Sequence, residues 1–192
     1  MTDESTLELV NRCAKQDTRA FEQLVRQFQS YVFALALRLL ADEDEAKDIV
    51  QECFVRVWKN MDKYDPKRKF TTWLYRIATN LSVDRLRAIK RNRRVFFTRD
   101  EQLQPEDVAS TEDIIDIQSN RELAAMIQEL TEELPVKQRL VFALRDLQDL
   151  SVEEVADIAD MSVGSVKTNL HYARRRIREL LARRYHVERW EP

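Results

Sequence analysis

Apolar residues repeat at helical spacing through the first half of the chain. They mark one long helix over Leu24–Leu39, a second over Ala46–Met61 and a third that begins near Phe70. Stripes at intervals of three and four residues are typical of amphipathic helices. Each stripe has to be buried against another helix, so this half of the chain predicts a small helical bundle.

A second helical pattern lies near the carboxyl end, in Leu150–Leu181. Ser151 and Glu154 form an S-x-x-E capping box that begins an acidic helix. Asp160 stands where the chain has to turn, because aspartate tolerates left-handed backbone angles. Ser162 is placed to cap the basic helix that follows. Two helices joined by a short turn predict a helix-turn-helix.

The basic helix of this pair has one apolar and one polar face. The apolar positions are Val163, Val166, Leu170, Ala173, Ile177 and Leu180. The polar face holds Ser165, Lys167, Thr168, Asn169, His171, Tyr172, Arg174, Arg175, Arg176 and Arg178. A helix of this kind fits the major groove of DNA, with some side chains on base edges and arginines on phosphates. The alternative is an exposed basic helix with no role in nucleic-acid binding.

Charge is strongly divided between these two helices. Residues 167–184 contain seven Lys or Arg and one acid, whereas residues 146–160 contain six acids and no base. Charge, helix spacing and turn chemistry together favour DNA binding over the alternative. Gly164, the only glycine, falls in the first turn of the basic helix. There it predicts a close approach of the backbone to the preceding helix or to a phosphate, in preference to a hinge.

The composition fits an all-α protein, because 192 residues include one glycine and four prolines. The net charge of −2 hides a second basic block, with twelve bases and two acids in residues 63–99. Residues 100–116 contain seven acids and no base, which predicts a solvated linker. We therefore expect two small helical domains joined by an acidic linker. The expected parts are domain 1–95, linker 96–118, domain 119–186 and tail 187–192.

Several kinds of site are disfavoured. No apolar stretch approaches the ~20 residues that cross a bilayer, and no signal peptide is recognisable, so we expect a cytoplasmic protein without membrane insertion. Cys13 and Cys53 are isolated in apolar patterns, far from His171 and His186, which predicts buried free thiols and neither metal nor cofactor. The consecutive acids of residues 42–45 point around their helix, which disfavours a metal-dependent nucleic-acid enzyme.

Two further groups of residues are candidates for binding. Asp48, Gln51 and Glu52 lie opposite the apolar stripe of the second helix, where spacing alone favours simple solvation over a partner. Around the third helix, bases alternate with aromatic rings, a combination suited to single-stranded nucleic acid. We expect Trp73 in the core and Tyr64, in a loop that contains Pro66, in contact with a base.

Four runs of the sequence resemble one known family. They are DIVQECFVRVW (48–58), FTTWLYRIATNLSVDRLR (70–87), LPVKQRLVFALRDLQDLSVEEVA (134–156) and SVGSVKTNLHYARRRI (162–177). In this order they are similar to the extracytoplasmic-function (ECF) sigma factors of bacterial RNA polymerase, members of the sigma-70 family. The resemblance covers nearly the whole chain apart from the linker and the tail. It implies a non-enzymatic protein that directs core polymerase to particular promoters and helps to open the duplex.

The resemblance also implies roles for individual residues. Asp48, Gln51 and Glu52 would contact the clamp helices of the largest polymerase subunit, which reverses the interpretation from spacing. The minus-10 DNA site would comprise Lys63, Tyr64, Arg76 and Asn80, with one base flipped into a loop pocket. The minus-35 DNA site would comprise Arg145, Ser165, Lys167, Thr168, His171, Tyr172 and Arg174.

Further partners implied by the resemblance are promoter DNA, the flap of the second-largest polymerase subunit and an anti-sigma factor. The acidic linker would run through the polymerase toward the RNA exit path. The competing hypothesis is a helix-turn-helix regulator that is not a polymerase subunit. The DIVQECF run and the second basic, aromatic region argue against that hypothesis.

Overall fold

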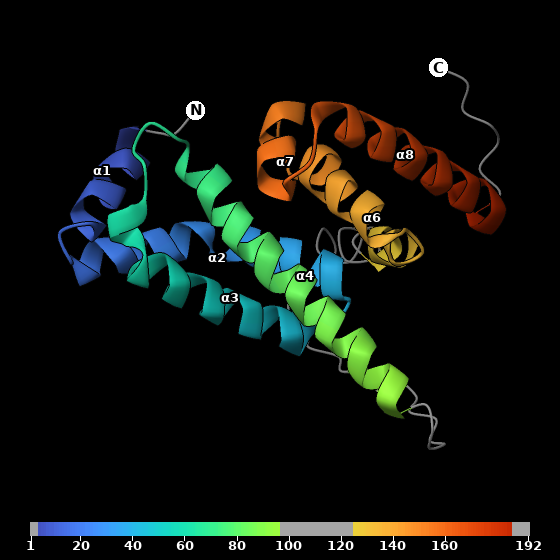
Figure 1. Cartoon of the computed structure of the whole chain (residues 1–192), viewed down its shortest axis with the longest axis horizontal. Helices are drawn as coiled ribbons and strands as arrows, with labels where there is room; N and C mark the ends of the chain where they lie inside the picture. The colour runs from blue at the N-terminus through green and yellow to red at the C-terminus, as the bar shows by residue number, and fades with distance from the viewer. Residues whose placement is uncertain (1–3, 97–124, 186–192) are drawn as a thin grey trace, which may run out of the picture.

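A computed structural model describes residues 4–96 and 125–185, and every regular element in these ranges is helical (Figure 1). The all-α prediction is confirmed. The first half contains α1 (Glu4–Cys13), α2 (Thr18–Leu40), α3 (Glu43–Lys59), the 3-10 turn η1 (Met61–Lys63) and α4 (Phe70–Phe96). The second half contains helical residues 125–132, α6 (Val136–Phe142), the π-helical turn η2 (Ala143–Leu147), α7 (Val152–Ala159) and α8 (Val163–Tyr185).

Helices α2, α3 and α4 form the predicted bundle, and α1, which the sequence analysis did not identify, packs on α2. Asp17 caps α2 by accepting hydrogen bonds from the backbone N–H groups of Arg19 and Ala20, and Asp42 caps α3 through that of Glu45. The second predicted helix ends at Lys59, two residues earlier than expected. The reason is a hydrogen bond of 2.8 Å from the Asn60 side chain to the Arg56 carbonyl, which closes the last turn.

The bundle buries the apolar stripes in one core. Leu24, Leu35, Ile49, Phe70 and Leu74 are among its largest fully buried side chains. The two cysteines, Cys13 and Cys53, are buried free thiols, as predicted. Burial raises the pKa of the Cys13 thiol to about 11 and that of the Cys53 thiol to about 12. Both thiols are therefore neutral and shielded at ordinary pH.

The helix-turn-helix has the caps that the sequence predicts. Ser151 and Glu154 form the capping box of α7, and Asp160 ends that helix in the left-handed conformation (φ 53°, ψ 52°). The Ser162 side chain accepts a hydrogen bond of 3.1 Å from the Ser165 backbone N–H at the start of α8. These local signals are short-range, which is why the sequence locates both ends of the turn.

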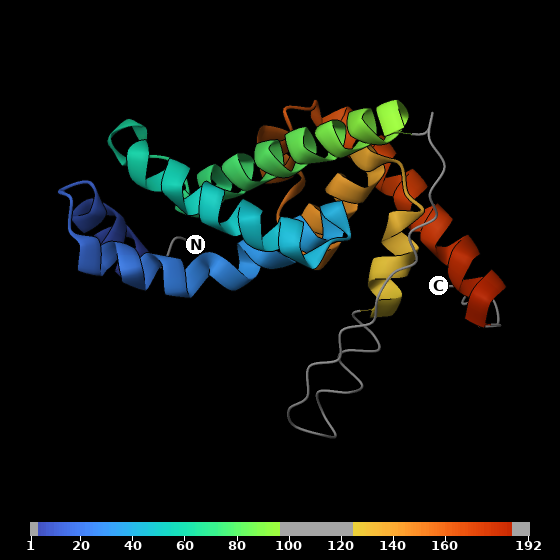
Figure 2. The ribbon, with the colours of Figure 1, turned by 90° about the horizontal axis from the view of Figure 1, so that it is seen from below.

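The two halves of the chain pack against each other. Helix α4 lies between α7 on one side and the α2–α3 pair on the other, and α6 lies beside the end of α2 (Figures 1 and 2). The buried apolar side chains form one cluster that continues from the bundle into Val141, Leu144 and Val155. The predicted tail and all of the predicted linker except Phe96, the last residue of α4, lie outside the described residues. Among the described helices, none combines the length and apolar character needed to cross a membrane.

Candidate nucleic-acid interface

Helix α3 presents a polar face away from the core. Asp48 and Gln51 are exposed, and the Glu52 carboxylate pairs with Arg56 at 2.7 Å on the surface. The structure adds Val55 to this face, with 49% of its surface exposed. Val55 was not predicted as part of this face, although its position outside the apolar stripe is a signal of exposure. An apolar side chain surrounded by charges is typical of a protein-binding surface.

The aromatic residues around the start of α4 are arranged differently from the prediction. Tyr64 is only 8% exposed, and its ring packs 5.8 Å from that of Phe70 and 5.3 Å from that of Trp73. Its hydroxyl donates a 2.5 Å hydrogen bond to the Arg68 carbonyl, and burial raises the pKa of Tyr64. The Tyr64 ring is therefore part of the core, and its expected contact with a base stays a prediction.

Trp73 packs against the core, as expected, but it is only partly buried and is therefore more exposed than Tyr64. The physical reason lies in the loop that follows η1. The loop turns back over Phe70, and the tyrosine both fills the space against that ring and ties the loop together through its hydroxyl. Tyr64 thereby fixes the loop that carries Arg68 and follows Lys63, the last residue of η1; both cations are exposed.

Two of the predicted minus-10 residues lie one turn apart on α4. Arg76 has 43% of its side chain exposed, and Asn80 is exposed. Residues four apart occupy the same face of a helix, so both side chains are available to one ligand. Lys63 lies in η1, where its ammonium group donates to the Asn60 side chain at 3.0 Å. This surface is cationic and partly aromatic, as the sequence analysis predicts.

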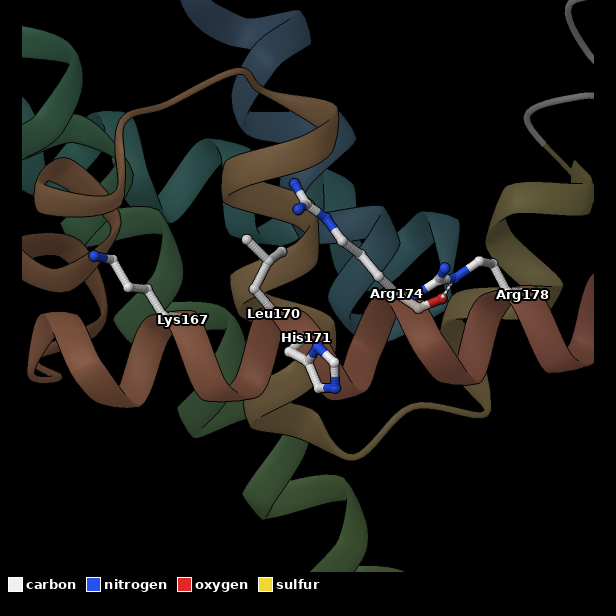
Figure 3. A pocket seen from close by; sticks show the side chains of 5 residues that line it. All are labelled: Lys167, Leu170, His171, Arg174 and Arg178. Carbon is white, nitrogen blue, oxygen red and sulfur yellow. Dashed lines mark hydrogen bonds between the residues drawn. The ribbon is translucent and has the colours of Figure 1, made fainter. Parts of the chain in front are cut away.

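The polar face of α8 carries the predicted minus-35 residues. Lys167, Thr168, His171 and Tyr172 are exposed, and Ser165 is half-buried. Lys167, His171, Arg174 and Arg178 line a shallow hollow whose floor includes Leu170 (Figure 3). The rings of His171 and Tyr172 meet edge to face with their centroids 5.6 Å apart. One face of one helix thus collects cations and hydrogen-bonding groups, the arrangement expected of a groove-reading helix.

Two of the predicted minus-35 residues, Arg145 and Arg174, are paired with carboxylates in or near η2. Arg174 donates two hydrogen bonds to Asp146, at 2.8 and 2.6 Å, and extends from α8 toward the neighbouring helix (Figure 3). Arg145 contacts Asp149 at 3.0 Å. The hydrogen bonds to Asp146 raise the pKa of Arg174, and half of its side chain stays exposed. Asp146 was not predicted, since no local signal links it to a residue 28 positions later.

Gly164 has ordinary helical angles and open space around it. A Cβ atom added there would have no heavy atom within 4 Å outside its own local backbone. The predicted close approach to the preceding helix is therefore wrong. The hydroxyl of Thr168 donates to the Gly164 carbonyl at 2.9 Å, and the face above the glycine is free. Of the two predicted reasons for this glycine, approach of a phosphate is the one that remains.

We expect Gly164→Ala to stabilise the free protein and to weaken its binding to duplex DNA. Alanine fits the space and improves the helix, by about 0.5–1 kcal/mol. At a backbone-phosphate contact the added methyl group would displace the DNA. Thermal unfolding and duplex binding of the same samples provide the measurement. A higher melting temperature with unchanged DNA affinity would show that no phosphate approaches Gly164.

The arrangement described so far defines an all-helical protein with a helix-turn-helix and a second cationic surface. Comparison with known families matches residues 24–92 to Sigma-70 region 2 and residues 124–177 to Sigma-70, region 4. The first match covers the bundle from within α2 to within α4. The second covers the helix-turn-helix and α6. These matches place the two cationic surfaces in two different regions of the sigma-70 architecture.

Whole-chain comparisons agree. The ECF RNA polymerase sigma factor SigW of Bacillus subtilis is 35% identical, over 90% of this chain and 94% of the relative. The ECF RNA polymerase sigma-E factor of Escherichia coli is 33% identical, over 88% of this chain and 90% of the relative. The solved structure of CnrH in complex with the cytosolic domain of CnrY superposes with a TM-score of 0.67 at 25% identity, covering 94% of this chain and 99% of CnrH. The chain belongs to the ECF family of RNA polymerase sigma factors.

Proposed function

We propose that the chain directs core RNA polymerase to its promoters by contacting DNA at two separate surfaces. The observation that carries this proposal is the presence of one exposed cationic surface in each half, on α4 with its preceding loop and on α8. We assign the minus-10 surface and polymerase binding to residues 1–95, and the minus-35 surface to residues 119–186. Residues 96–118 would join them and residues 187–192 would form a tail without an assigned role.

Polymerase binding is assigned to the exposed face of α3. Asp48, Gln51 and Glu52 would contact the clamp helices of the largest subunit, and Val55 would supply the apolar centre of that contact. The combination of exposed carboxylates and an exposed valine on one face of α3 supports this assignment. The flap of the second-largest subunit is the proposed partner of the second half.

The minus-10 surface is assigned to Lys63, Arg76 and Asn80, with Tyr64 in a supporting role. Tyr64 is buried and donates a hydrogen bond to the Arg68 carbonyl, which suits a residue that shapes the loop around a flipped base. Unstacking such a base costs a few kcal/mol. Trp73 and the exposed loop cations are available to the same strand. Stacking on rings and contacts between cations and phosphates are how single strands bind without duplex geometry.

The minus-35 surface is assigned to α8 in the major groove. Lys167, Thr168, His171 and Tyr172 would face base edges or nearby phosphates, and Ser165 would lie at the entrance. Arg145 and Arg174 would hold the DNA backbone, oriented beforehand by Asp149 and Asp146. A guanidinium fixed by a carboxylate loses less side-chain freedom when a phosphate arrives.

The proposal also covers the type of activity, the location in the cell and a further protein partner. The protein would act without covalent chemistry, in the cytoplasm, where polymerase and promoter DNA are found. CnrH was solved in complex with the cytosolic domain of CnrY, which supports a second protein as a further partner of this chain, and we assign that role to an anti-sigma factor. The competing hypothesis of a free DNA-binding regulator would not require the α3 face.

The test is transcription by the purified chain with core polymerase on a matching promoter. We expect Lys167→Ala to weaken upstream promoter binding by about 1–3 kcal/mol with unchanged polymerase affinity. Arg183→Ala, which removes the same charge from an exposed position farther along α8, is the matched control. Tight duplex binding by the free chain without any polymerase association would contradict the proposal.

A second prediction separates the two DNA surfaces. We expect Asn80→Ala to leave upstream binding intact and to impair opening of the duplex or selection of the minus-10 sequence. Permanganate footprinting of open complexes, alongside upstream binding, measures both effects on one sample. Normal open complexes with Asn80→Ala would remove this residue from the minus-10 surface.

A further inference from the structure

Most polar side chains on the outward side of α8 are already bonded within the protein. Between Lys167 and Arg178, six of them have a hydrogen-bond or ion-pair partner: Thr168, Asn169, Arg174, Arg175, Arg176 and Arg178. For Lys167, His171 and Tyr172, all exposed, no such partner is observed within the described residues. A bonded group has to give up its present partner to read a base, whereas these three do not.

Lys167 and His171 lie one turn apart and line the hollow above Leu170 (Figure 3). The other cations of this hollow are Arg174, which Asp146 holds through two hydrogen bonds, and Arg178, whose Nε donates to the Arg174 carbonyl at 3.4 Å. The unbonded donors of the hollow therefore belong to the first half of α8. The first turns of such a helix are the part that contacts base edges in the major groove.

The chemistry of the hollow favours one kind of base. Lysine and arginine carry donors and no acceptor, and a neutral imidazole has one N–H and one acceptor nitrogen. Because cations surround the His171 ring, its acceptor nitrogen is favoured on their side and its N–H is left for the groove. Guanine presents two acceptors there, N7 and O6, whereas adenine and cytosine each present an amino donor and thymine a methyl group beside one acceptor. A hollow of donors complements guanine best.

The spacing of the two donors indicates how many bases they reach. Four residues of an α-helix rise about 6 Å, and successive base pairs of B-DNA lie roughly 3.4 Å apart. Lys167 and His171 can therefore contact bases that are adjacent or two steps apart on one strand, with the flexible lysine covering the difference. Arg174 and Arg178 lie one and two turns farther along, where a helix that crosses the groove meets phosphates.

Tyr172 supports the imidazole from the side. Half of the tyrosine is exposed, and its ring meets that of His171 edge to face, with the centroids 5.6 Å apart and the planes inclined at 72°. Such a contact is favourable in itself and restricts rotation of the neighbouring ring. Tyr172 is therefore placed to orient His171.

We propose that Lys167 and His171 are the base-specific contacts of α8 and select guanines at two neighbouring positions on one strand of the minus-35 element. Tyr172 is the positioning residue that orients the His171 ring. Arg174 and Arg178 hold phosphates and bind all sequences alike. The inference rests on the proposed function, because it names the bases that the minus-35 surface selects.

The experiment is transcription by the full-length chain with core RNA polymerase from promoters randomised in both elements, followed by sequencing of the transcripts. For wild type we expect guanine to be favoured about tenfold at two neighbouring upstream positions. Lys167→Ala should remove the preference at one position and His171→Ala at the other. Arg183→Ala removes the same charge as Lys167→Ala from an exposed position of α8, and it should keep both preferences.

Further variants separate positioning and phosphate binding from base reading. Arg174→Ala should lower transcription from all upstream sequences by a similar factor, with both guanine preferences retained. Tyr172→Ala should reduce the preference only at the position assigned to His171, and Tyr172→Phe, which keeps the ring, should restore it. A purely structural role of Tyr172 would instead lower transcription without changing either preference.

Modified bases identify the atoms that are read. In the promoter most enriched by wild type, 7-deazaguanine removes the N7 acceptor, whereas hypoxanthine removes only the amino group in the minor groove. At the position assigned to His171, we expect 7-deazaguanine to weaken binding of the duplex by the holoenzyme about tenfold and hypoxanthine to leave it unchanged. In His171→Ala the effect of 7-deazaguanine should disappear.

Three results would overturn the inference. They are transcription without any upstream guanine preference, both preferences surviving in Lys167→Ala and His171→Ala, and equal effects of the two modified bases. Each of them leaves the proposed function intact, because transcription still depends on the chain. Absence of transcription from every promoter of the library would refute the proposed function and this inference with it.

Discussion

Reversing two carboxylates on α3, through Asp48→Arg with Glu52→Arg, is expected to lower the affinity for core RNA polymerase about a hundredfold, or roughly 3 kcal/mol. Both side chains are exposed, so the fold should survive the change. Affinity would fall because the basic polymerase surface that complements the acidic face of α3 would then face two arginines. Binding of labelled protein to purified core polymerase measures the effect directly.

The chain offers a closely matched control for Glu52→Arg, which makes half of this change of charge. Glu22 and Arg26 on α2 form a surface pair at 2.6 Å with the same i,i+4 geometry as Glu52 and Arg56 at 2.7 Å. Glu22→Arg therefore removes an equivalent ion pair outside the proposed interface, and it should leave polymerase affinity unchanged. If Glu22→Arg and Glu52→Arg, which change the net charge equally, lose the same affinity, the effect is one of charge alone and the α3 face is not the docking surface.

Removing the ring of Phe70 is expected to destabilise the first half by about 3–5 kcal/mol. Phe70 is fully buried at the start of α4. The centroid of its ring lies 5.4 Å from that of Phe28, 5.8 Å from that of Tyr64 and 5.9 Å from that of Trp73. Phe70→Ala would leave a cavity below the loop that carries the minus-10 cations. We therefore expect loss of duplex opening together with loss of stability, measured by denaturant unfolding and permanganate footprinting.

Tyr31→Ala is the comparison for Phe70→Ala. Tyr31 also contacts Phe28, at 6.4 Å, but half of its surface is exposed. Its removal should change the free energy of unfolding by no more than about 0.5 kcal/mol, as is usual for surface positions. Similar losses for the two variants would mean that Phe70 is not at the centre of the aromatic cluster.

The capping and turn residues show why the helix-turn-helix was predictable. Ser151, Glu154, Asp160 and Ser162 act on backbone groups within three or four positions of themselves, so their effect is contained in the local sequence. The exposed residues of α8 were predictable for a related reason. Helical periodicity places them opposite an apolar stripe that has to be buried.

The aromatic cluster shows where local reasoning fails. Tyr64 and Trp73 are both aromatic residues near basic ones, so the local sequence does not show which side chain is more exposed. Tyr64 was expected to be the more exposed of the two, but it is the more buried. Their exposure depends on how the loop folds over Phe70 and on the hydroxyl contact with Arg68. A loop has no helical periodicity from which burial can be predicted, so packing alone decides which of the two rings is buried.

The sequence by itself determined the three long helices of the bundle, the helix-turn-helix with its caps, the division of charge and the family resemblance, because these depend on neighbouring residues and on motifs. Only the tertiary structure decided that Asp146 pairs with Arg174, that Gly164 has free space, and that α7 packs against α4. Lys69 and Glu154 are 85 positions apart, and Arg139 and Leu39 are 100 apart. Contacts between such distant residues depend on how whole helices pack, which the spacing of residues along the chain does not encode.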